Sequence, residues 1–285
     1  MSRSIAGLSV IITGGARGIG RATVDRFVRQ GARVAIGDLD ANLAASVAAE
    51  YGDQKVTSAR LDVGSRESWE AFLDEVGHFG PWDVLINNAG IMPLGPVLEE
   101  PDGVTKAIMD VNVYGVIHGT KLVGPGMVER GSGHIINVAS AVGRVALANG
   151  ATYSASKFAV VGFTEAVRQE LAPAGVDVTM VLPSVVQTEL ATGVPAARGV
   201  KKVTADDVAE VIESAVRKPR AEMWVPRWGQ AISKPTLALP RVVQDGITRM
   251  IKADEVLNSA DLSARAAYEA RARRTAEEPV EATQE

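Results

Sequence analysis

The start of the chain joins a short apolar run, a glycine-rich turn and an amphipathic helix, and few folds accommodate that order. The apolar run covers residues 8–13, the turn covers residues 14–20, and the helical pattern continues to about residue 30. A nearly continuous apolar run of this length is typical of a parallel strand that is buried on both faces. The unit therefore predicts an α/β fold that begins with strand, turn and helix.

The glycine-rich turn indicates a binding site for a phosphate group. Gly14, Gly18 and Gly20 would let the backbone approach a pyrophosphate, and a helix N-terminus offers unpaired N–H groups with a partial positive charge. Arg17 and Ile19 lie in the same turn and are candidate cofactor contacts as well. The glycine spacing differs from the tighter dinucleotide-binding fingerprint, so a purely structural tight turn is the alternative.

The second apolar run, residues 33–38, ends in Asp38, which lies eighteen residues after Gly20. An aspartate at this place can accept hydrogen bonds from both hydroxyls of an adenosine ribose, and it would repel the 2′-phosphate of NADP. Arg17 is the opposing signal, because a cation in the turn would attract that phosphate. Two like charges in contact cost more than one lost phosphate contact, so the balance favours NAD over NADP.

Helical patterns near residues 41–50 and 66–77 alternate with strand patterns near 55–61 and 82–87, which is typical of a doubly wound sheet. Polar and small residues follow the third and fourth strands. Open α/β sheets bind ligands at the carboxyl ends of their strands, although each of these segments would also serve as a strand-ending turn. The candidate cofactor contacts here are Asp62, Val63, Asn88, Ala89 and Gly90.

Tyr153 and Lys157 form a candidate acid/base pair. Residues four apart share one face of a helix, and no helix breaker lies between these two. To act as a base at neutral pH, a phenol needs a pKa about three units below its usual value, or about 4 kcal/mol. An ammonium group about 4 Å away supplies that amount at an effective dielectric constant of about 20. Tyr51 and Lys55 have the same spacing, but a glycine between them indicates a helix end.

Ser140 ends the strand pattern that begins at His134, and it precedes Tyr153 by thirteen residues. Together with the glycine turn, residues 87–90 and Asn112, this order resembles the short-chain dehydrogenase/reductase family over residues 5–226. The resemblance implies a doubly wound Rossmann fold with a seven-stranded parallel sheet and a nicotinamide dinucleotide cofactor. It also implies that Asn112, Ser140, Tyr153 and Lys157 correspond to the catalytic tetrad.

The same resemblance implies a role for each member of the tetrad. Tyr153 would exchange a proton with the substrate oxygen, and Ser140 would orient that oxygen. Lys157 would lower the pKa of Tyr153 and bind the nicotinamide ribose. Asn112 lies in a helical pattern over residues 101–127, where it would bend the helix and hold a water molecule that connects Lys157 to solvent. Without the resemblance, Asn112 reads as a buried amide that bonds to backbone.

The segment after the sixth expected strand, residues 176–182, carries further family positions. Val186 and Thr188 match residues that bind the nicotinamide carboxamide, so both are predicted cofactor contacts. Ser184 stands where the family usually has glycine, and this departure concerns the local backbone path. Residues 189–203 correspond to the substrate lid of the family, and its apolar surface is predicted to be Leu190, Val194 and Pro195.

The predicted walls of the substrate pocket are apolar apart from one charge. We expect an NAD-dependent oxidoreductase that transfers a hydride between the cofactor and a neutral, apolar secondary alcohol or ketone, including steroid-like and lipid-derived ones. The alternatives are an NADP-dependent ketone reductase and, less favoured, a non-catalytic dinucleotide-sensing protein on the same fold. The wall residues are Met92, Leu94, Val142, Arg144, Val145, Leu147, Val185 and Leu190.

Composition argues against several other classes of protein. The 285 residues contain no cysteine and only three scattered histidines, so we expect neither a disulfide nor a metal site. The net charge of −4 argues against a nucleic-acid partner. No apolar run is long enough to span a membrane and no secretory cleavage pattern occurs, so a cytoplasmic enzyme is expected. The family resemblance adds a homo-oligomer, either a tetramer or a dimer.

The chain continues beyond the last expected strand, near residues 222–226. We expect a dehydrogenase domain over residues 1–230, a helical extension over 231–274 and a disordered tail over 275–285. A helical pattern at 240–252 carries an apolar stripe that some surface must cover. Packing on its own or a partner subunit near the pocket mouth is favoured over membrane contact, because the segment has no aromatic residue and only three cations. The stripe consists of Val242, Val243, Ile247, Met250 and Ile251.

Overall fold

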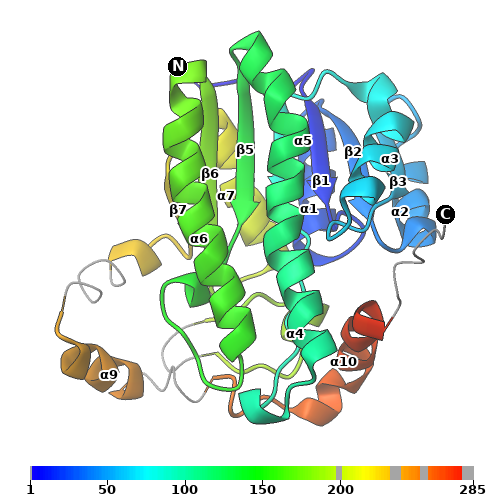
Figure 1. The fold of residues 1–285 in the computed structure, drawn as a ribbon. Coiled ribbons are helices and arrows are strands. Elements are labelled where there is room, and N and C mark those ends of the chain that lie inside the picture. The colour runs from blue at the N-terminus through cyan, green and yellow to red at the C-terminus, as the bar shows by residue number, and fades with distance from the viewer. Residues whose placement is uncertain (1, 197–200, 232–238, 251–255, 278–285) are drawn as a thin grey trace.

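The computed structural model describes residues 2–196, 201–231, 239–250 and 256–277, and strands and helices alternate along most of this length (Figure 1). The strands are β1 (Ser9–Thr13), β2 (Arg33–Asp38), β3 (Val56–Arg60), β4 (Val84–Asn87), β5 (Gly133–Val138), β6 (Val176–Pro183) and β7 (Glu222–Val225). The helices are α1 (Gly18–Arg29), α2 (Ala41–Ala49), α3 (Arg66–Val76), α4 (Asp102–Met109), α5 (Gly115–Arg130), α6 (Ala151–Leu171), α7 (Ala205–Arg217), α9 (Arg241–Met250) and α10 (Leu262–Glu277).

The seven strands form one sheet in the order β3-β2-β1-β4-β5-β6-β7, and every neighbouring pair is parallel. Helices cover both faces of this sheet (Figure 1). The doubly wound seven-stranded fold expected from the sequence is therefore confirmed. Strand order reverses between β1 and β4, and sheets of this kind bind ligands beside such a reversal, at the carboxyl ends of the strands.

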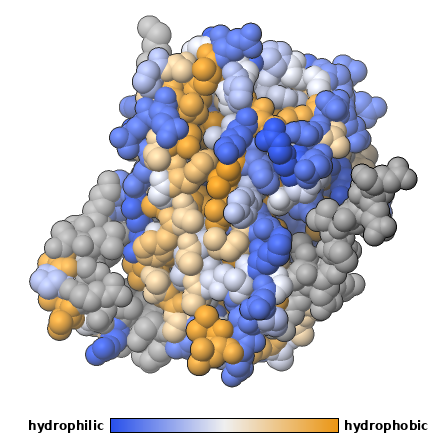
Figure 2. Space-filling model, viewed as in Figure 1, coloured by the Kyte–Doolittle hydropathy of each residue, from blue (hydrophilic) through white to orange (hydrophobic). Residues whose placement is uncertain are grey.

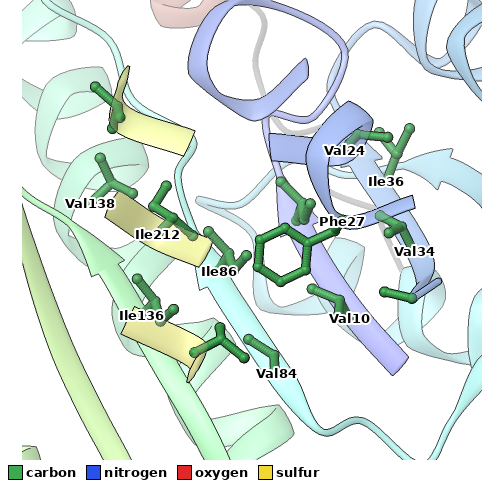
Figure 3. Packing of buried hydrophobic residues seen from close by; sticks show 14 of the residues in the cluster. Val10, Val24, Phe27, Val34, Ile36, Val84, Ile86, Ile136, Val138 and Ile212 are labelled. Carbon is green, nitrogen blue, oxygen red and sulfur yellow. The ribbon is translucent and has the colours of Figure 1, made fainter. Parts of the chain in front are cut away.

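The central strand β1 shows why the apolar runs lie inside the molecule. All five of its residues are buried, and successive side chains point to opposite faces of the sheet. Val10 and Ile12 join the core on one face, and Ile11 joins the core on the other. Figure 3 shows the first of these cores, where Phe27 of α1 and Ile212 of α7 pack against the strands. Full burial of a side chain such as Phe27 contributes about 1.5–3 kcal/mol.

The helical pattern over residues 101–127 forms two helices rather than one. α4 ends at Met109, a π-helical turn occupies Asp110–Tyr114, and α5 continues to Arg130. Asn112 lies in the π-helical turn, as expected for a residue that bends the helix. Single π-helical turns of this kind interrupt the regular hydrogen-bond ladder and commonly occur at functional sites.

The first helix of the extension, α9, leaves its described apolar side chains exposed in the single chain, so the predicted contact with a partner subunit stays a prediction. In the single chain, Val242 of α9 is 83% exposed and Met250 is 70% exposed, and Figure 1 shows α9 standing apart from the sheet. The side chain of Ile247 and the whole of Ile251 lie outside the described residues. α10 packs against α4 instead, so the part of the extension that covers the domain lies further along the chain.

α10 ends at Glu277 and therefore includes the first residues of the predicted disordered tail, whose remainder, residues 278–285, lies outside the described ranges. Among the helices in the described part of the chain, none is both long and apolar enough to cross a membrane.

Candidate active site

The glycine turn joins β1 to α1 at the carboxyl edge of the sheet. Gly14 and Gly18 adopt positive φ angles of 63° and 51°, which side chains with a Cβ rarely tolerate. A Cβ on Gly20 would lie 2.0 Å from the carbonyl oxygen of Gly14, so no larger residue fits there. α1 begins at Gly18, and its first N–H groups therefore lie at the turn, where they can bind an anion.

Thr13 and Asn88 hold the ends of β1 and β4 together. The Thr13 hydroxyl oxygen accepts hydrogen bonds from the N–H groups of Asn88 and Ala89, each at 3.0 Å. The Asn88 amide group donates to the carbonyl oxygens of Thr13 and Gly14, at 2.9 and 3.1 Å. The glycine turn is thus fixed against the loop that follows β4, at the reversal of strand order.

Asp38 ends β2 beside the glycine turn. Its carboxylate accepts the N–H groups of Ala16 at 3.0 Å and of Asp40 at 3.1 Å, and burial raises its pKa. Arg17 points toward other acids: its guanidinium group lies 2.8 Å from the Asp40 carboxylate and 3.7 Å from that of Glu189. The Arg17 charge, which the sequence set against Asp38, is therefore already paired with other carboxylates. Asp40 and Glu189 were not identified from the sequence.

The remaining predicted cofactor residues lie at the carboxyl edge of the sheet, at different distances from the turn. Asp62 and Val63 follow β3, two strands from β1, and the Asp62 carboxylate accepts the N–H group of Gly64 at 2.9 Å. Thr188 approaches the turn directly, since its methyl group would lie 3.2 Å from a Cβ on Gly18. Val186 is buried and forms an isolated bridge with Val203.

Two further residues that the sequence analysis singled out, Ile19 and Ser184, have structural partners. Ile19 is partly buried against the core between α1 and the sheet. Ser184 donates its N–H group to the carbonyl oxygen of Val225 at 2.8 Å, so the backbone path continues from β6 alongside β7 despite the departure from glycine.

Ser140, Tyr153 and Lys157 come together beside the end of β5. The strand ends at Val138, two residues earlier than predicted, and Ser140 starts a short turn in which its hydroxyl oxygen accepts the N–H group of Val142 at 3.1 Å. Ser140 lies close enough to Tyr153 for its side chain to lower the pKa of the phenol. Lys157, one turn further along α6, donates to the carbonyl oxygen of Val138 at 3.1 Å.

Burial dominates the protonation of both groups on α6. Burial raises the pKa of Tyr153 to about 12, and the nearby Ser140 side chain only partly opposes this rise. Burial also lowers the pKa of Lys157 to about 8. Lys157 does not bring the pKa of Tyr153 below its usual value in this structure, and the expectation that its charge lowers that pKa stays a prediction. The ammonium group lies 5.8 Å from the centre of the Tyr153 ring and bonds to backbone, so its attraction does not offset the desolvation of the phenol.

Asn112 reaches the same cluster from the π-helical turn. Its amide nitrogen donates to the carbonyl oxygen of Ile91 at 2.9 Å and to the Ser156 hydroxyl at 3.0 Å, and its oxygen accepts the Ile91 N–H at 2.9 Å. A Cβ on Gly90 would lie 3.2 Å from that oxygen and 3.6 Å from the Lys157 nitrogen. Asn112 is thus the buried amide that the sequence allowed, close to Lys157. Ser156 was missed, although it lies inside the motif around Tyr153.

The apolar surroundings of Tyr153 match the predicted walls in most respects. Arg144 is an exception, because its guanidinium group pairs with Glu165 and Glu222, and Val145 lies outside the cluster. The C-terminal extension also contributes Val256 and Leu257, two residues that were not predicted to line the site and that are buried in the same cluster as Tyr153. The predicted residues found there are Met92, Leu94, Val142, Leu147, Val185, Leu190 and Val194.

Comparison with known sequences identifies relatives of this chain. The family described as short chain dehydrogenase matches residues 9–199. A 3beta-hydroxysteroid dehydrogenase 2 from Eggerthella lenta is 40% identical over 208 residues, which cover 70% of this chain and 80% of the relative. A 3-alpha-(or 20-beta)-hydroxysteroid dehydrogenase from Mycobacterium bovis is 37% identical over 196 residues, which cover 68% of this chain and 75% of the relative.

Solved structures share the fold over most of its length. A short chain dehydrogenase/reductase from Burkholderia phymatum in complex with NAD is 26% identical with a TM-score of 0.74, covering 81% of this chain and 93% of that protein. A short chain dehydrogenase from Burkholderia cenocepacia in complex with NADP is 28% identical with a TM-score of 0.75, covering 87% and 99%. The matched sequence, the sheet order and the residues gathered beside β5 lead to one conclusion: this chain belongs to the short-chain dehydrogenase/reductase family.

Proposed function

We propose that the protein is an NAD-dependent oxidoreductase that interconverts a neutral, apolar secondary alcohol and its ketone. Membership of the family makes it an oxidoreductase that acts on hydroxyl or carbonyl groups with a nicotinamide cofactor. The observation that carries the finer proposal is the Ser140, Tyr153 and Lys157 cluster, which lies next to an apolar cluster of side chains.

Tyr153 is the proposed proton donor to a ketone oxygen. With its pKa near 12, the phenol keeps its proton at neutral pH and can release it to an oxygen on which negative charge develops. Ser140 lies beside that phenol, so its hydroxyl is placed to hold the same substrate oxygen and stabilise its charge. In the opposite direction the phenol must first lose its proton, so alcohol oxidation should accelerate as pH rises.

Lys157 and Asn112 support this transfer from the protein side. The Lys157 ammonium group provides positive charge beside the phenol, which favours the anion that forms when the proton leaves. Asn112 fixes the loop after β4 through both ends of its amide. The proposed water-mediated relay through Asn112 would replenish the proton, and the buried position of Lys157 makes such a path to solvent necessary.

The residues at the glycine turn fit a dinucleotide. The close approach at Gly20 and the start of α1 at Gly18 suit a pyrophosphate, and the nicotinamide ring, when bound, accepts or supplies the hydride. Asp38 supports NAD as the cofactor, because a second negative charge beside its buried carboxylate would be unfavourable. Arg17, the residue best placed to offset that charge, is held by Asp40.

The apolar cluster supports a substrate that is neutral and mostly hydrocarbon. Arg144, the one charge predicted in its walls, is paired with carboxylates elsewhere. Two relatives carry the name hydroxysteroid dehydrogenase, which places a steroid-like alcohol within the proposed class.

The proposed assembly is a homo-oligomer that uses the face formed by α5 and α6. Figure 2 shows apolar side chains along this face, and the exposed ones include Val128 and Phe158. Contact with a second copy would bury them.

The test is NAD(P)H fluorescence turnover against a panel of secondary alcohols and ketones, with both cofactors. The unaltered protein should prefer NAD in kcat/KM. Tyr153→Phe should lower kcat by at least about a hundredfold and leave NADH binding nearly unchanged, because only the proton donor is lost. Tyr114→Phe, at an exposed tyrosine, is the matched control. Near-normal turnover by Tyr153→Phe would contradict the assignment, and a preference for NADP would contradict the argument from Asp38.

A further inference from the structure

α10 carries an arginine and a glutamate that lie inside the molecule. Arg265 is 0% exposed, and Glu269, four residues later on the same helical face, is also buried. The Arg265 Nε and Glu269 Oε1 atoms are 3.0 Å apart. A buried guanidinium group is unfavourable unless its N–H groups find partners, so the surroundings of Arg265 must supply them.

The partners of Arg265 are backbone carbonyl groups from two separate loops. Its Nη1 atom donates to the oxygens of Leu190 and Thr192, at 2.9 and 3.0 Å, in the loop after β6. Its Nη2 atom donates to the oxygen of Met92 at 2.7 Å, in the loop after β4. One side chain therefore joins two loops that are about a hundred residues apart in sequence.

Two neighbouring residues of α10 strengthen its connection to the loop after β4. The Tyr268 hydroxyl accepts the N–H group of Met92 at 2.7 Å, and the Glu269 carboxylate accepts the N–H group of Leu94 at 3.3 Å. Arg265, Tyr268 and Glu269 are spaced at i, i+3 and i+4, so all three lie on the face of α10 that meets these loops.

The two loops flank the proposed proton donor. Met92 and Leu94 from one loop and Val194 from the other lie in the same buried cluster as Tyr153. Leu257, shortly before α10, joins this cluster, and Tyr153 is only 6% exposed. Burial raises the pKa of the Tyr268 phenol, and a charge on nearby Tyr153 adds to that rise. The C-terminal segment thus covers Tyr153 at the carboxyl edge of the sheet.

We propose that Arg265 is a positioning residue for the substrate, which holds α10 across the two loops as the outer wall of the site. The wall belongs to the same chain as Tyr153, and its fit to the substrate sets KM. This inference rests on the proposed function. The surface pair between Arg271 and Glu189 also joins α10 to the loop after β6, but it is exposed to solvent and contributes less.

The first variant is Arg265→Met, which nearly keeps the length of the side chain and removes its hydrogen-bond donors. The second is Arg265→Lys, which keeps the positive charge but has fewer hydrogen-bond donors than arginine. Both are measured in the full-length protein with the best small and the best large ketone of the panel. Arg26→Met is the matched control, because Arg26 pairs with Asp206 and Glu213 between α1 and α7. Hydrogen–deuterium exchange of the loops containing Met92 and Leu190 provides a readout that needs no turnover.

Arg265→Met should raise KM for the large ketone roughly tenfold, with kcat and the NADH dissociation constant within about threefold of the unaltered protein. Amide exchange should become faster in both loops, Arg265→Lys should be intermediate, and Arg26→Met should change neither KM nor loop exchange. If Arg265→Met does not fold, Arg265→Lys decides by the same measurements.

Unchanged exchange in either loop would overturn the proposal. So would faster exchange with unchanged KM, or an equal fall in kcat for both ketones, because each would assign Arg265 a purely structural role. If the unaltered protein turns over nothing in the panel, the proposed function fails by itself, and loop exchange still decides whether Arg265 holds α10 in place.

Discussion

The buried position of Lys157 disfavours the charged form of its side chain. Burial lowers its pKa to about 8, whereas a lysine in the unfolded chain titrates near 10.5. Below pH 8 the folded protein therefore contains a buried ammonium group at the expense of stability. This cost falls as pH rises from 8 to 10.5, where the folded state releases the proton before the unfolded state does. Lys157 thus lowers the stability of the fold, and its charge has a proposed role in catalysis.

Replacement of Lys157 by methionine should therefore stabilise the fold and remove activity. Removal of the buried charge should raise the free energy of unfolding by about 3 kcal/mol, the amount that corresponds to the pKa shift. Loss of the hydrogen bond to the Val138 carbonyl should lower it by about 1 kcal/mol, so we expect a net increase of about 2 kcal/mol at pH 7. Thermal unfolding at pH 7 and pH 10 measures this gain, which should shrink at the higher pH. Lys121→Met, on α5, is the control. Equal or lower stability of Lys157→Met at pH 7 would contradict the account.

Asp40 is predicted to contribute to cofactor choice by holding Arg17. Asp40→Asn keeps an oxygen to cap α2 through the Leu43 N–H group and removes the charge that pairs with Arg17. The kcat/KM for NADPH should rise roughly fivefold, the worth of about one exposed ion pair, while that for NADH changes little.

A double variant with Arg17→Gln added should lose the improvement produced by Asp40→Asn. If NADPH use does not improve in the single variant, or if the improvement survives in the double variant, Arg17 is not the group that Asp40 controls.

At the scale of elements, the connection between β1 and β4 determines where the cofactor turn lies. Thr13 accepts two backbone N–H groups from the loop after β4, and both would lose their partner in Thr13→Val, which has nearly the same shape. We expect a loss of about 2–4 kcal/mol in the free energy of unfolding, because a buried unpaired donor costs about 1–3 kcal/mol. Urea unfolding measures it.

The same substitution at Thr57 on β3 is the matched control and should change stability by less than about 0.5 kcal/mol. Cofactor affinity should also fall in Thr13→Val, because the glycine turn and Asn88 would no longer be held together. A variant with unaltered stability and NADH affinity would show that packing alone positions the turn.

At the scale of the whole molecule, the two helices of the extension differ in what they contact. α10 packs on its own domain, whereas the described apolar side chains of α9 are exposed in the single chain. We therefore expect α9 to contact a partner subunit. Val242→Ser combined with Met250→Ser should reduce the molar mass measured by light scattering and leave KM unchanged, since α10 remains in place.

The control for α9 is Leu262→Ser, at an exposed apolar residue at the start of α10, which should not change the molar mass. Unchanged mass in the α9 variant, together with binding of the unaltered protein to anionic liposomes, would favour a membrane surface as the partner of α9.

The order of local features along the sequence determined the sheet and most of the site. The apolar run before Gly14, the carboxylate at the end of β2 and the Tyr153 and Lys157 pair depend on residues close in sequence, whose periodicity and turn chemistry are readable directly. The expectation of seven parallel strands came from the resemblance that these motifs carry, and it was confirmed by the observed order.

Only the tertiary structure decided the electrostatics and the outer wall of the site. The pKa of Tyr153 depends on how completely the surrounding chain excludes water, and no spacing rule contains that quantity. The pairing of Arg17 with Asp40 depends on where two loops meet. Arg265 is 75 residues from Leu190 and 173 residues from Met92, and a charged residue on a helix reads in sequence as a solvated one. Long-range contacts of this kind are determined by the packing of the whole chain, which is why the sequence placed the extension near the pocket mouth but did not identify α10 and Arg265 as the part that covers it.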